Sequence, residues 1–470
     1  MQITDFHINT QLQQVINAEQ AHYYRIIPSD QTNGDLSFLT DSNNPDQIKN
    51  ELEIILGKKI FLTIESSDII QKYLHTNYRK QKDQKTSELH YSNDFLLKLI
   101  HEAKNIGSSD IHFEIFEHKS RVRFRIDGKL LEHYIIPIQE YPTIINRIKI
   151  LAQLDISEKR LPQDGRINIS NNQTEFDIRV SALPTLFGEK IVLRILSKDK
   201  TVVDLEALGF TPIELNRYKE GIKNPNGIIL ISGPTGSGKT TTLYATLKLL
   251  NTNEANILTI EDPIEYTLAG INQVQLKENI GLDFSKALKT FLRQDPDIIM
   301  VGEIRDPDTA NMAVRAALTG HLVLSTIHTN SAWATVSRLV DMGVPPFLIA
   351  ATLKISVAQR LVRLLCDSCK QKDLLTAANL PENFTGQDDL KFHYKAVGCE
   401  KCHHTGYAGR KAIYEIIPIT KELIDLIRKN ELEIEDYLQQ KNIPTLKSNA
   451  VDLIKSGITS IDEVYALLTN

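Results

Sequence analysis

Residues 228–241 read Ile-Ile-Leu-Ile-Ser-Gly-Pro-Thr-Gly-Ser-Gly-Lys-Thr-Thr, and this stretch decides the fold. Its first four residues predict a buried strand, and residues 241–250 predict a helix. The loop between them fits G-x-x-x-x-G-K-[ST], in which glycines let backbone N–H groups converge on phosphate beside a positive helix end. This context favours a nucleoside triphosphate site over a chance glycine-rich turn. The predicted binding residues are Gly233, Pro234, Thr235, Gly236, Ser237, Gly238, Lys239, Thr240 and Thr241.

Two side chains of this loop carry specific chemistry. Lys239 offers a mobile cation to the β- and γ-phosphates, and the Thr240 hydroxyl completes a Mg²⁺ shell. The sequence therefore predicts a site for a triphosphate together with its magnesium ion.

Apolar runs recur between helical segments on both sides of the loop. Residues 228–231, 257–260, 298–301 and 322–325 are four such runs. Continuous apolar strands that alternate with helices indicate a buried parallel sheet with helices on both faces, so we predict an α/β fold from residue 201 onward.

Acidic residues follow two of these runs. Glu303 comes directly after one strand, and Glu261, Asp262 and Glu265 end another. The carboxyl ends of parallel strands face the ligand crevice, and clustered carboxylates are costly unless a cation relieves them. A magnesium–triphosphate pair would do so, whereas a solvated acidic loop is the alternative.

His321 and His328 flank the run at 322–325. A lone histidine is more often a hydrogen-bonded structural residue, but two beside one sheet suggest a functional pair. We predict that they sense or orient the γ-phosphate.

The cysteines form two C-x-x-C pairs, Cys366 with Cys369 and Cys399 with Cys402. Four thiolates can close a tetrahedral Zn²⁺ site, which is structural because no coordination position remains open. A redox pair or unrelated free thiols are the alternatives.

The composition is that of a folded chain with several domains. At roughly 150 residues per domain, 470 residues suggest about three. The net charge of -5 disfavours a main task in binding nucleic-acid backbones. No apolar run approaches the ~20 residues of a membrane helix, and the start lacks a secretory-signal pattern. Four cysteines do not make a disulfide framework here, so we expect a reducing cytosol.

Changes of pattern divide the chain. Residues 1–76 read as a small α/β domain, and 77–90 as a linker because apolar residues are scarce. Helical and alternating patterns predict an α+β domain with a mostly antiparallel sheet at 91–200. Residues 201–470 form the phosphate-loop domain, with a zinc subdomain at 362–411 and a helical cap at 420–470.

The order of the motifs resembles one family. Several segments closely resemble the hexameric secretion-superfamily ATPases that drive type II secretion and type IV pilus assembly. They are the phosphate loop, Glu-Asp-Pro-Ile-Glu at 261–265, the segments 293–306 and 318–330, and the paired cysteines followed by His-His-Thr-Gly-Tyr. The resemblance extends from about Ser108 to the C-terminus and includes the segments 107–114 and 160–166. Residues 1–76 resemble the family's recruitment domain only by position and size.

This resemblance implies a RecA-like parallel-sheet ATPase domain, preceded by a PAS-like α+β middle domain and a small N-terminal α/β domain. It implies ATP, Mg²⁺ and Zn²⁺ as cofactors and a homo-hexamer that binds inner-membrane platform and recruitment proteins. The expected protein is a cytoplasmic motor, peripherally associated with the inner membrane, that powers assembly of a pseudopilus or pilus. No nucleic-acid partner is expected.

The family's roles can be carried onto matching residues. Glu265 is expected to orient or deprotonate the attacking water, Glu303 takes the Walker-B role, and His321 and His328 form the family's His box. Arg179 and Arg194 match arginines that the middle domain lends to the phosphates. Lys289 stands where the family often has arginine, and its part in the site is open.

Three other functions compete with the assembly motor. A retraction motor of the same superfamily resembles this chain less, because such motors usually lack the four cysteines and the extra N-terminal domain. A nucleic-acid translocase is disfavoured by the charge and by the lack of a basic, aromatic-interleaved stretch. A non-enzymatic scaffold conflicts with the intact loop and acidic positions. The motifs do not separate secretion from pilus assembly or name the cargo, the docking partner or the ring symmetry.

Overall fold

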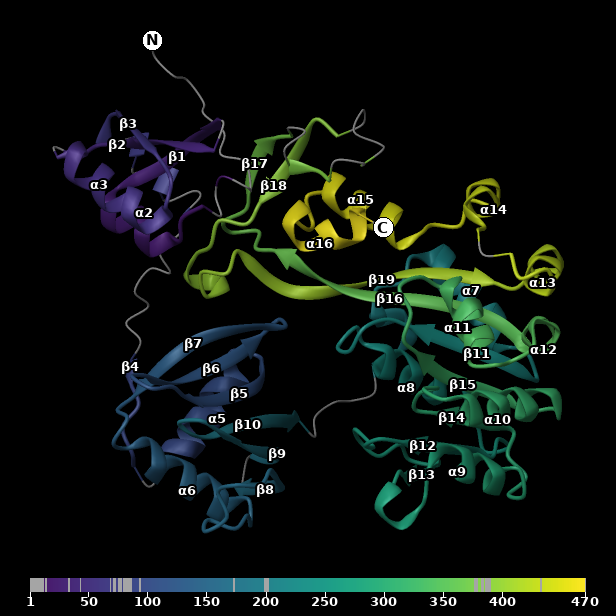
Figure 1. Cartoon of the computed structure of the whole chain (residues 1–470). Coiled ribbons are helices and arrows are strands. Elements are labelled where there is room, and N and C mark those ends of the chain that lie inside the picture. Colours follow the sequence, from purple (N-terminus) through teal and green to yellow (C-terminus); the bar gives the residue numbers. More distant parts are fainter. Residues whose placement is uncertain are drawn as a thin grey trace.

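Figure 1 shows the computed structural model of the chain. The structure describes residues 12, 15–32, 34–42, 44–67, 69–70, 73–74, 78, 87–92, 94–171, 174–197, 203–375, 379–381, 384, 390–431 and 433–469. In this part of the chain the strands form two large and two small sheets.

The phosphate-loop sheet contains the decisive apolar runs. Its order is β13 (Asn272–Gln275), β12 (Ile257–Glu261), β14 (Ile298–Val301), β15 (Leu322–Ile327), β11 (Gly227–Ser232), β16 (Leu353–Leu365) and β19 (Tyr407–Pro418). Neighbours pair in parallel except β16 with β19, which are antiparallel. The predicted α/β class with a buried parallel sheet is confirmed.

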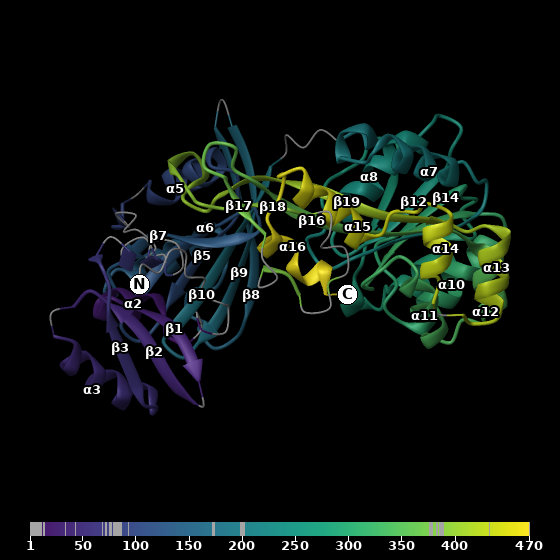
Figure 2. The same ribbon diagram turned by 90° about the horizontal axis from the view of Figure 1, so that it is seen from above.

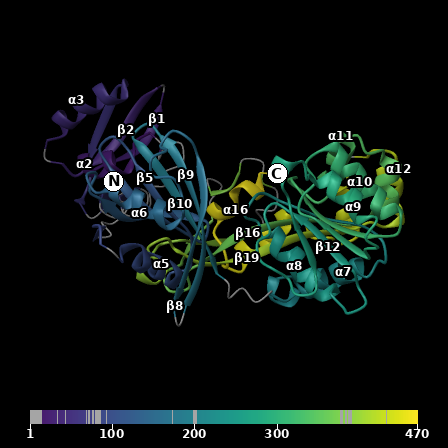
Figure 3. The same ribbon diagram turned by 90° about the horizontal axis from the view of Figure 1, so that it is seen from below.

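Helices cover both faces of this sheet, as Figure 3 shows. The helices α7 (Pro212–Ile222) and α8 (Lys239–Leu250) lie on one face. The other face is covered by α9 (Phe284–Phe291), α10 (Pro307–Leu318), α11 (Ala334–Asp341) and α12 (Pro346–Thr352). Short 3-10 turns lie at η1 (Leu205–Leu208) and η2 (Glu278–Ile280). The strands are apolar throughout because both of their faces are buried against helices.

The second large sheet, here called the middle sheet, has one apolar and one charged face. Its order is β4 (Ser87–Glu88), β7 (Lys129–Ile136), β6 (Ser120–Ile126), β5 (Ser108–Ile115), β10 (Gly188–Ser197), β9 (Thr174–Thr185) and β8 (Gln163–Asn171). The apolar face packs on α5 (Phe95–Asn105) and α6 (Tyr141–Leu151). On β6, for example, Val122 and Phe124 are buried, whereas Arg121, Arg123 and Arg125 alternate with them on the other face.

The predicted linker needs one correction. Most of residues 77–90 lies outside the described residues, but Ser87–Glu88 pair in parallel with β7. The end of that segment is therefore part of the middle sheet. The pairing uses backbone groups alone, so a sequence poor in apolar side chains can still form it.

The N-terminal sheet is small and built around a crossover. Strand β1 (Ile26–Thr32) is antiparallel to β2 (Asp35–Thr40), and β3 (Ile60–Ile64) is parallel to β2. The helix α3 (Pro45–Leu56) connects β2 to β3, and α2 (Ala18–Tyr24) precedes β1. Leu36, Phe38 and Leu52 lie in its apolar core, which fits the predicted small α/β unit.

Strands β16 and β19 extend from the phosphate-loop sheet toward the middle sheet, as Figures 1 and 2 show. The remaining elements are β17 (Gln371–Leu374), β18 (Phe392–Lys395), η5 (Glu400–Cys402), α13 (Lys421–Arg428), α14 (Glu435–Gln440), α15 (Leu446–Lys455) and α16 (Ile461–Leu468). An ion pair of 2.6 Å between Arg363 and Glu463 ties α16 to β16. No helix of the described residues is both long and apolar enough to span a bilayer.

Candidate nucleotide site

The phosphate loop has a backbone that only glycine allows at several points. Gly236 and Gly238 have φ values of 79° and 87°, in the left-handed region. A Cβ atom on Gly233 would lie 2.5 Å from the carbonyl oxygen of Gln359. The Ser237 hydroxyl inside the loop is buried and has no hydrogen-bond partner. A cradle that a Cβ would fill, with an orphaned donor in it, fits a bound phosphate group.

Lys239 lies at the first position of α8 and is largely buried. Its ammonium group donates hydrogen bonds to the carbonyl oxygens of Gly233 at 2.8 Å and Pro234 at 3.1 Å. Burial lowers the pKa of Lys239, and the nearby Glu303 carboxylate opposes that shift. The cation is thus held within the loop, where a phosphate oxygen would be a stronger acceptor than a carbonyl. The Thr240 side chain is exposed in the same helical turn.

Gln359 supports the loop from the neighbouring strand β16. Its side-chain nitrogen donates to the carbonyl oxygen of Ser237 at 2.9 Å, and its side-chain oxygen accepts from the Thr242 hydroxyl at 2.9 Å. No local motif marks Gln359, so it was not predicted from the sequence. Its polarity gave no clear signal either, because β16 also contains Lys354, Ser356, Arg360 and Arg363.

Parallel pairing brings the carboxyl ends of β14 and β15 beside the phosphate loop. Glu303, two residues after β14, accepts a hydrogen bond from Arg305, and its carboxylate lies 3.4 Å from Nε2 of His328. Burial alone would raise the pKa of Glu303, but the charges of Arg305, His328 and Lys239 lower it overall. Glu303 is therefore an ionised group close to the phosphate-loop lysine.

Glu261 at the end of β12 is buried and satisfied by protein groups. Tyr244 donates a hydrogen bond to its Oε2, and its Oε1 accepts from Thr259 at 2.6 Å and from Gln273 at 3.1 Å. The expectation that a bound cation relieves all three carboxylates of this segment is wrong for Glu261. Tertiary hydrogen bonds do so instead.

Glu265 is partly exposed and faces the middle sheet. Its carboxylate lies 3.8 Å from Nη1 of Arg179, whose Nη2 donates to the Ile264 carbonyl at 2.9 Å. The backbone N–H of Glu265 points at the Tyr244 hydroxyl, 3.4 Å away. The segment that carries Glu265 is thus held between the helix after the phosphate loop and an arginine from the middle sheet.

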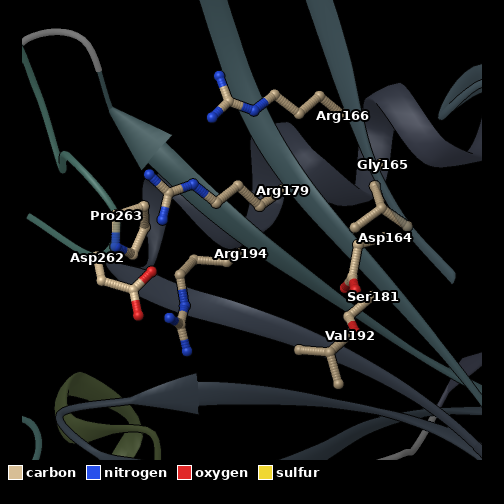
Figure 4. A pocket seen from close by; sticks show the side chains of 10 residues that line it. Asp164, Gly165, Arg166, Arg179, Ser181, Val192, Arg194, Asp262 and Pro263 are labelled. Carbon is tan, nitrogen blue, oxygen red and sulfur yellow. The ribbon is translucent and has the colours of Figure 1, made fainter. Parts of the chain in front are cut away.

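A cavity of about 720 Å³ opens between the two large sheets (Figure 4). Its walls include Arg166, Arg179 and Arg194 from the middle sheet and Asp262 and Pro263 from the segment after β12. Arg194 donates to Asp110 at 2.9 Å. The arrangement places middle-sheet guanidinium groups opposite the acidic segment. The expected role of Arg179 and Arg194 at the phosphates stays a prediction.

His321 requires a correction. It lies at the amino end of β15, where its carbonyl oxygen accepts from the N–H of Gly227 and its Nδ1 lies 2.8 Å from the Ala316 carbonyl oxygen. His328 lies at the opposite end of the same strand. Because a strand rises about 3.3 Å per residue, the two imidazoles lie at opposite ends of β15 and do not form a pair within one chain.

The four cysteines come together as predicted. The Sγ atoms of Cys366, Cys369, Cys399 and Cys402 all lie within 4.8 Å of one another. Burial alone would raise the pKa of Cys402, but N–H groups of Cys399 and Gly406 donate to its sulfur and lower that pKa to about 7. Four converging sulfurs with N–H donors fit a structural zinc ion.

Comparison with known families agrees with this geometry. The family described as "Type II/IV secretion system protein" matches residues 85–466. The chain belongs to this family.

Two relatives of this type II/IV secretion system protein are named as ATPases. The type IV pilus assembly ATPase PilB of Myxococcus xanthus is 48% identical over 366 residues, which cover 76% of this chain and 64% of PilB. The type II secretion system ATPase E of Vibrio cholerae is 45% identical over 376 residues, which cover 78% of this chain and 74% of that protein. The chain therefore spans less than two thirds of the length of this PilB relative.

Solved structures support the fold of this secretion system protein. The Legionella pneumophila ATPase DotB superposes with a TM-score of 0.61 at 22% identity, covering 82% of this chain and 97% of DotB. The pilus retraction motor PilT with bound ADP superposes with a TM-score of 0.54 at 26% identity, covering 79% of this chain and 96% of PilT. These likenesses agree with the predicted RecA-like domain.

Within this family member, the structure gathers some predicted residues and leaves others apart. Lys239, Glu303 and His328 lie together, and Glu265 lies against Arg179. His321 lies at the amino end of β15, away from these residues. Lys289 is exposed on α9, where its carbonyl accepts from Arg293 at 2.9 Å.

Proposed function

We propose that the chain is an ATP-hydrolysing motor that powers assembly of a pseudopilus or pilus in a type II secretion or type IV pilus system. The phosphate loop, with its buried lysine and orphaned serine hydroxyl beside an ionised Glu303, carries this proposal. The family match and the names of the relatives support the motor role.

The proposed reaction converts ATP and water into ADP and phosphate. Residues 233–241 hold the triphosphate, Lys239 contacts its β- and γ-phosphates, and Glu265 orients the attacking water. Thr240 and Glu303 would hold Mg²⁺, and His328 beside Glu303 would orient the γ-phosphate. The metal supplies charge neutralisation when it is bound. Most of the rate enhancement then comes from positioning and electrostatics.

Arg179 and Arg194 would complete the site from the middle sheet. A guanidinium group is planar and permanently charged, so it can contact several phosphate oxygens in the transition state. Both arginines now bind protein groups, the carbonyl of Ile264 and the carboxylate of Asp110. We infer that the two large sheets close over the nucleotide during turnover, which couples hydrolysis to a mechanical step.

The proposed assembly is a homo-hexamer that acts in the cytoplasm at the inner membrane. Residues 1–76 would dock on platform and recruitment proteins, 77–90 would connect them to the middle domain at 91–200, and 201–470 would form the motor domain. The zinc subdomain at 362–411 and the helical cap at 420–470 would belong to that motor domain, with Zn²⁺ bound by the four cysteines.

A retraction motor is the nearest alternative. The match to PilT covers nearly all of PilT but leaves about a fifth of this chain outside it. Because the curated relatives quoted above are assembly and secretion ATPases, we favour the assembly motor.

Steady-state hydrolysis of ATP by the purified chain tests the proposal. Lys239→Ala should abolish turnover, whereas Arg194→Ala should leave nucleotide binding largely intact while turnover collapses. Lys248→Ala, on the same helix but paired with Asp204, is the control and should keep wild-type activity. Absence of magnesium-dependent nucleotide binding by the wild-type chain would refute the proposal.

A second measurement separates motor classes. Stimulation of hydrolysis by vesicles of anionic lipid, or by an inner-membrane platform protein, would favour the assembly motor. Stimulation by single-stranded DNA would instead support a nucleic-acid translocase.

A further inference from the structure

Three arginines stand directly opposite one another on adjacent strands of the middle sheet. Arg166 on β8 pairs in register with Arg179 on β9, and Arg179 pairs with Arg194 on β10. Directly opposite residues of antiparallel strands share a face, with Cβ atoms about 5 Å apart. The three side chains therefore form one row, and in Figure 4 they extend from their strands toward the cavity. We call this set the arginine row.

The arginine row is not explained by the stability of the sheet. Like charges directly opposite each other on a sheet destabilise it. Arg194 is compensated by Asp110, and Arg179 by the carbonyl of Ile264 and by Glu265. In the described part of the chain, the side chain of Arg166 has neither a hydrogen bond nor an ion pair.

The cavity itself carries an excess of positive charge. Its charged walls are the arginine row against Asp164 and Asp262. Asp164 shares the face of Arg166 two residues away on β8, yet no ion pair of 4.0 Å or less joins them. The Nε atom of Arg179 is buried without a hydrogen-bond partner. An uncompensated cation and an orphaned donor in one cavity indicate an anionic ligand.

We propose that Arg166 is a third phosphate-binding arginine, which contacts the triphosphate together with Arg179 and Arg194 when the two large sheets close. This rests on the proposed function and deepens it. A row about 10 Å long can contact more than one phosphate group, so the middle sheet would bind a triphosphate more tightly than a diphosphate. Arg166 is exposed and unpaired, so it can move toward the phosphates without breaking an existing bond.

The test compares variants of the full chain with magnesium present. Affinities for fluorescent analogues of ADP and of non-hydrolysable ATP are measured, together with kcat, KM, Tm and the mass of the assembly. Arg166→Ala should weaken binding of the ATP analogue severalfold, weaken binding of the ADP analogue less, and lower kcat. Arg166→Lys should recover only part of the lost affinity and turnover, since lysine keeps the charge but lacks the planar guanidinium group.

The Tm of the variant distinguishes a binding role of Arg166 from a structural role, because loss of a structural residue would lower it. Removing one of three like charges should leave Tm unchanged or raise it. Arg160→Ala is the matched control, because that side chain is 89% exposed and pairs only with Glu158 of its own loop. It should behave like the wild type in every measurement.

Three results would overturn the proposal. The first is an Arg166→Ala variant with wild-type affinities and turnover, and the second is a variant whose Tm falls sharply or that does not fold. The third is a loss of activity that follows a change in assembly mass while the affinity for the ATP analogue is unchanged. A wild-type chain that neither binds nor hydrolyses ATP would instead refute the proposed function itself.

Discussion

The hydroxyl of Tyr244 donates a hydrogen bond to the buried carboxylate of Glu261. Tyr244 lies on the helix that begins at the phosphate loop, and Glu261 ends the strand before the acidic segment. The same hydroxyl lies 3.4 Å from the backbone nitrogen of Glu265. One phenol therefore joins the helix that follows the phosphate loop to the proposed water-orienting residue.

Tyr244→Phe should lower kcat severalfold while the affinity for ATP changes little. The variant keeps the ring but leaves buried Glu261 with one donor fewer, so the free energy of unfolding should also fall by about 1–2 kcal/mol. Turnover and thermal denaturation measure the two effects. Tyr266→Phe, whose ring packs edge-on against Tyr244 with centroids 4.6 Å apart, is the control. Equal losses of activity in both variants would contradict the positioning role.

The carboxylates at the two ends of the acidic segment should respond differently to amide substitution. Glu265→Gln should abolish turnover and leave Tm unchanged, since this side chain is 40% exposed. Glu261→Gln should lower the free energy of unfolding by about 1–3 kcal/mol, because an amide nitrogen would face buried donors. Activity and denaturation measured on both variants check this contrast. A Glu261→Gln variant that is stable but inactive would contradict the assignment of the water-orienting role to Glu265 rather than Glu261.

The cysteine cluster should hold one zinc ion per chain. Cys402→Ser should abolish zinc binding and lower the free energy of unfolding by several kcal/mol, because metal affinity contributes to folding. Elemental analysis and thermal denaturation measure the two quantities. Ser368→Ala, exposed between Cys366 and Cys369, should match the wild type. A chain purified without zinc, with unchanged Tm after chelation, would rule out a structural metal.

Acid should destabilise the middle sheet through His112. Burial and the charges of Lys190 and Arg125 lower its pKa to about 4, against opposing effects of Asp110 and Glu114. Because the folded-state value lies below the ordinary 6.5, this contribution to stability is complete above pH 6.5 and is lost as the pH falls toward 4. The total is about 3 kcal/mol at most.

His112→Gln removes the titrating group and should flatten the dependence of Tm on pH between 6.5 and 5. That interval lies above the range in which Glu114 affects stability, since the pKa of Glu114 is ordinarily 4.5 and is lowered to about 2 in the folded protein. His118→Gln, 88% exposed on the following turn, should keep the wild-type profile. An unchanged slope in His112→Gln would mean that other groups cause the acid sensitivity.

Features that depend on neighbouring residues were predictable from the sequence. The strand, loop and helix around residues 228–250 follow from an apolar run, glycines with free backbones and a helix-forming segment. The structure begins α8 at Lys239, two residues before the predicted start, because the left-handed Gly238 ends the loop directly. The two cysteine pairs each define half of a site by spacing alone, and they meet as predicted.

The sequence by itself determined the parallel-sheet domain, the phosphate loop and the cysteine cluster, because backbone freedom, apolar periodicity and short ligand spacing are local properties of the chain. Only the tertiary structure decided that Tyr244 donates a hydrogen bond to Glu261 and that His321 lies at the end of β15 away from the phosphate loop. It also decided that Arg166, Arg179 and Arg194 share one row. Strand register and direction set those relationships, and they arise from backbone pairing between segments that are distant in the chain.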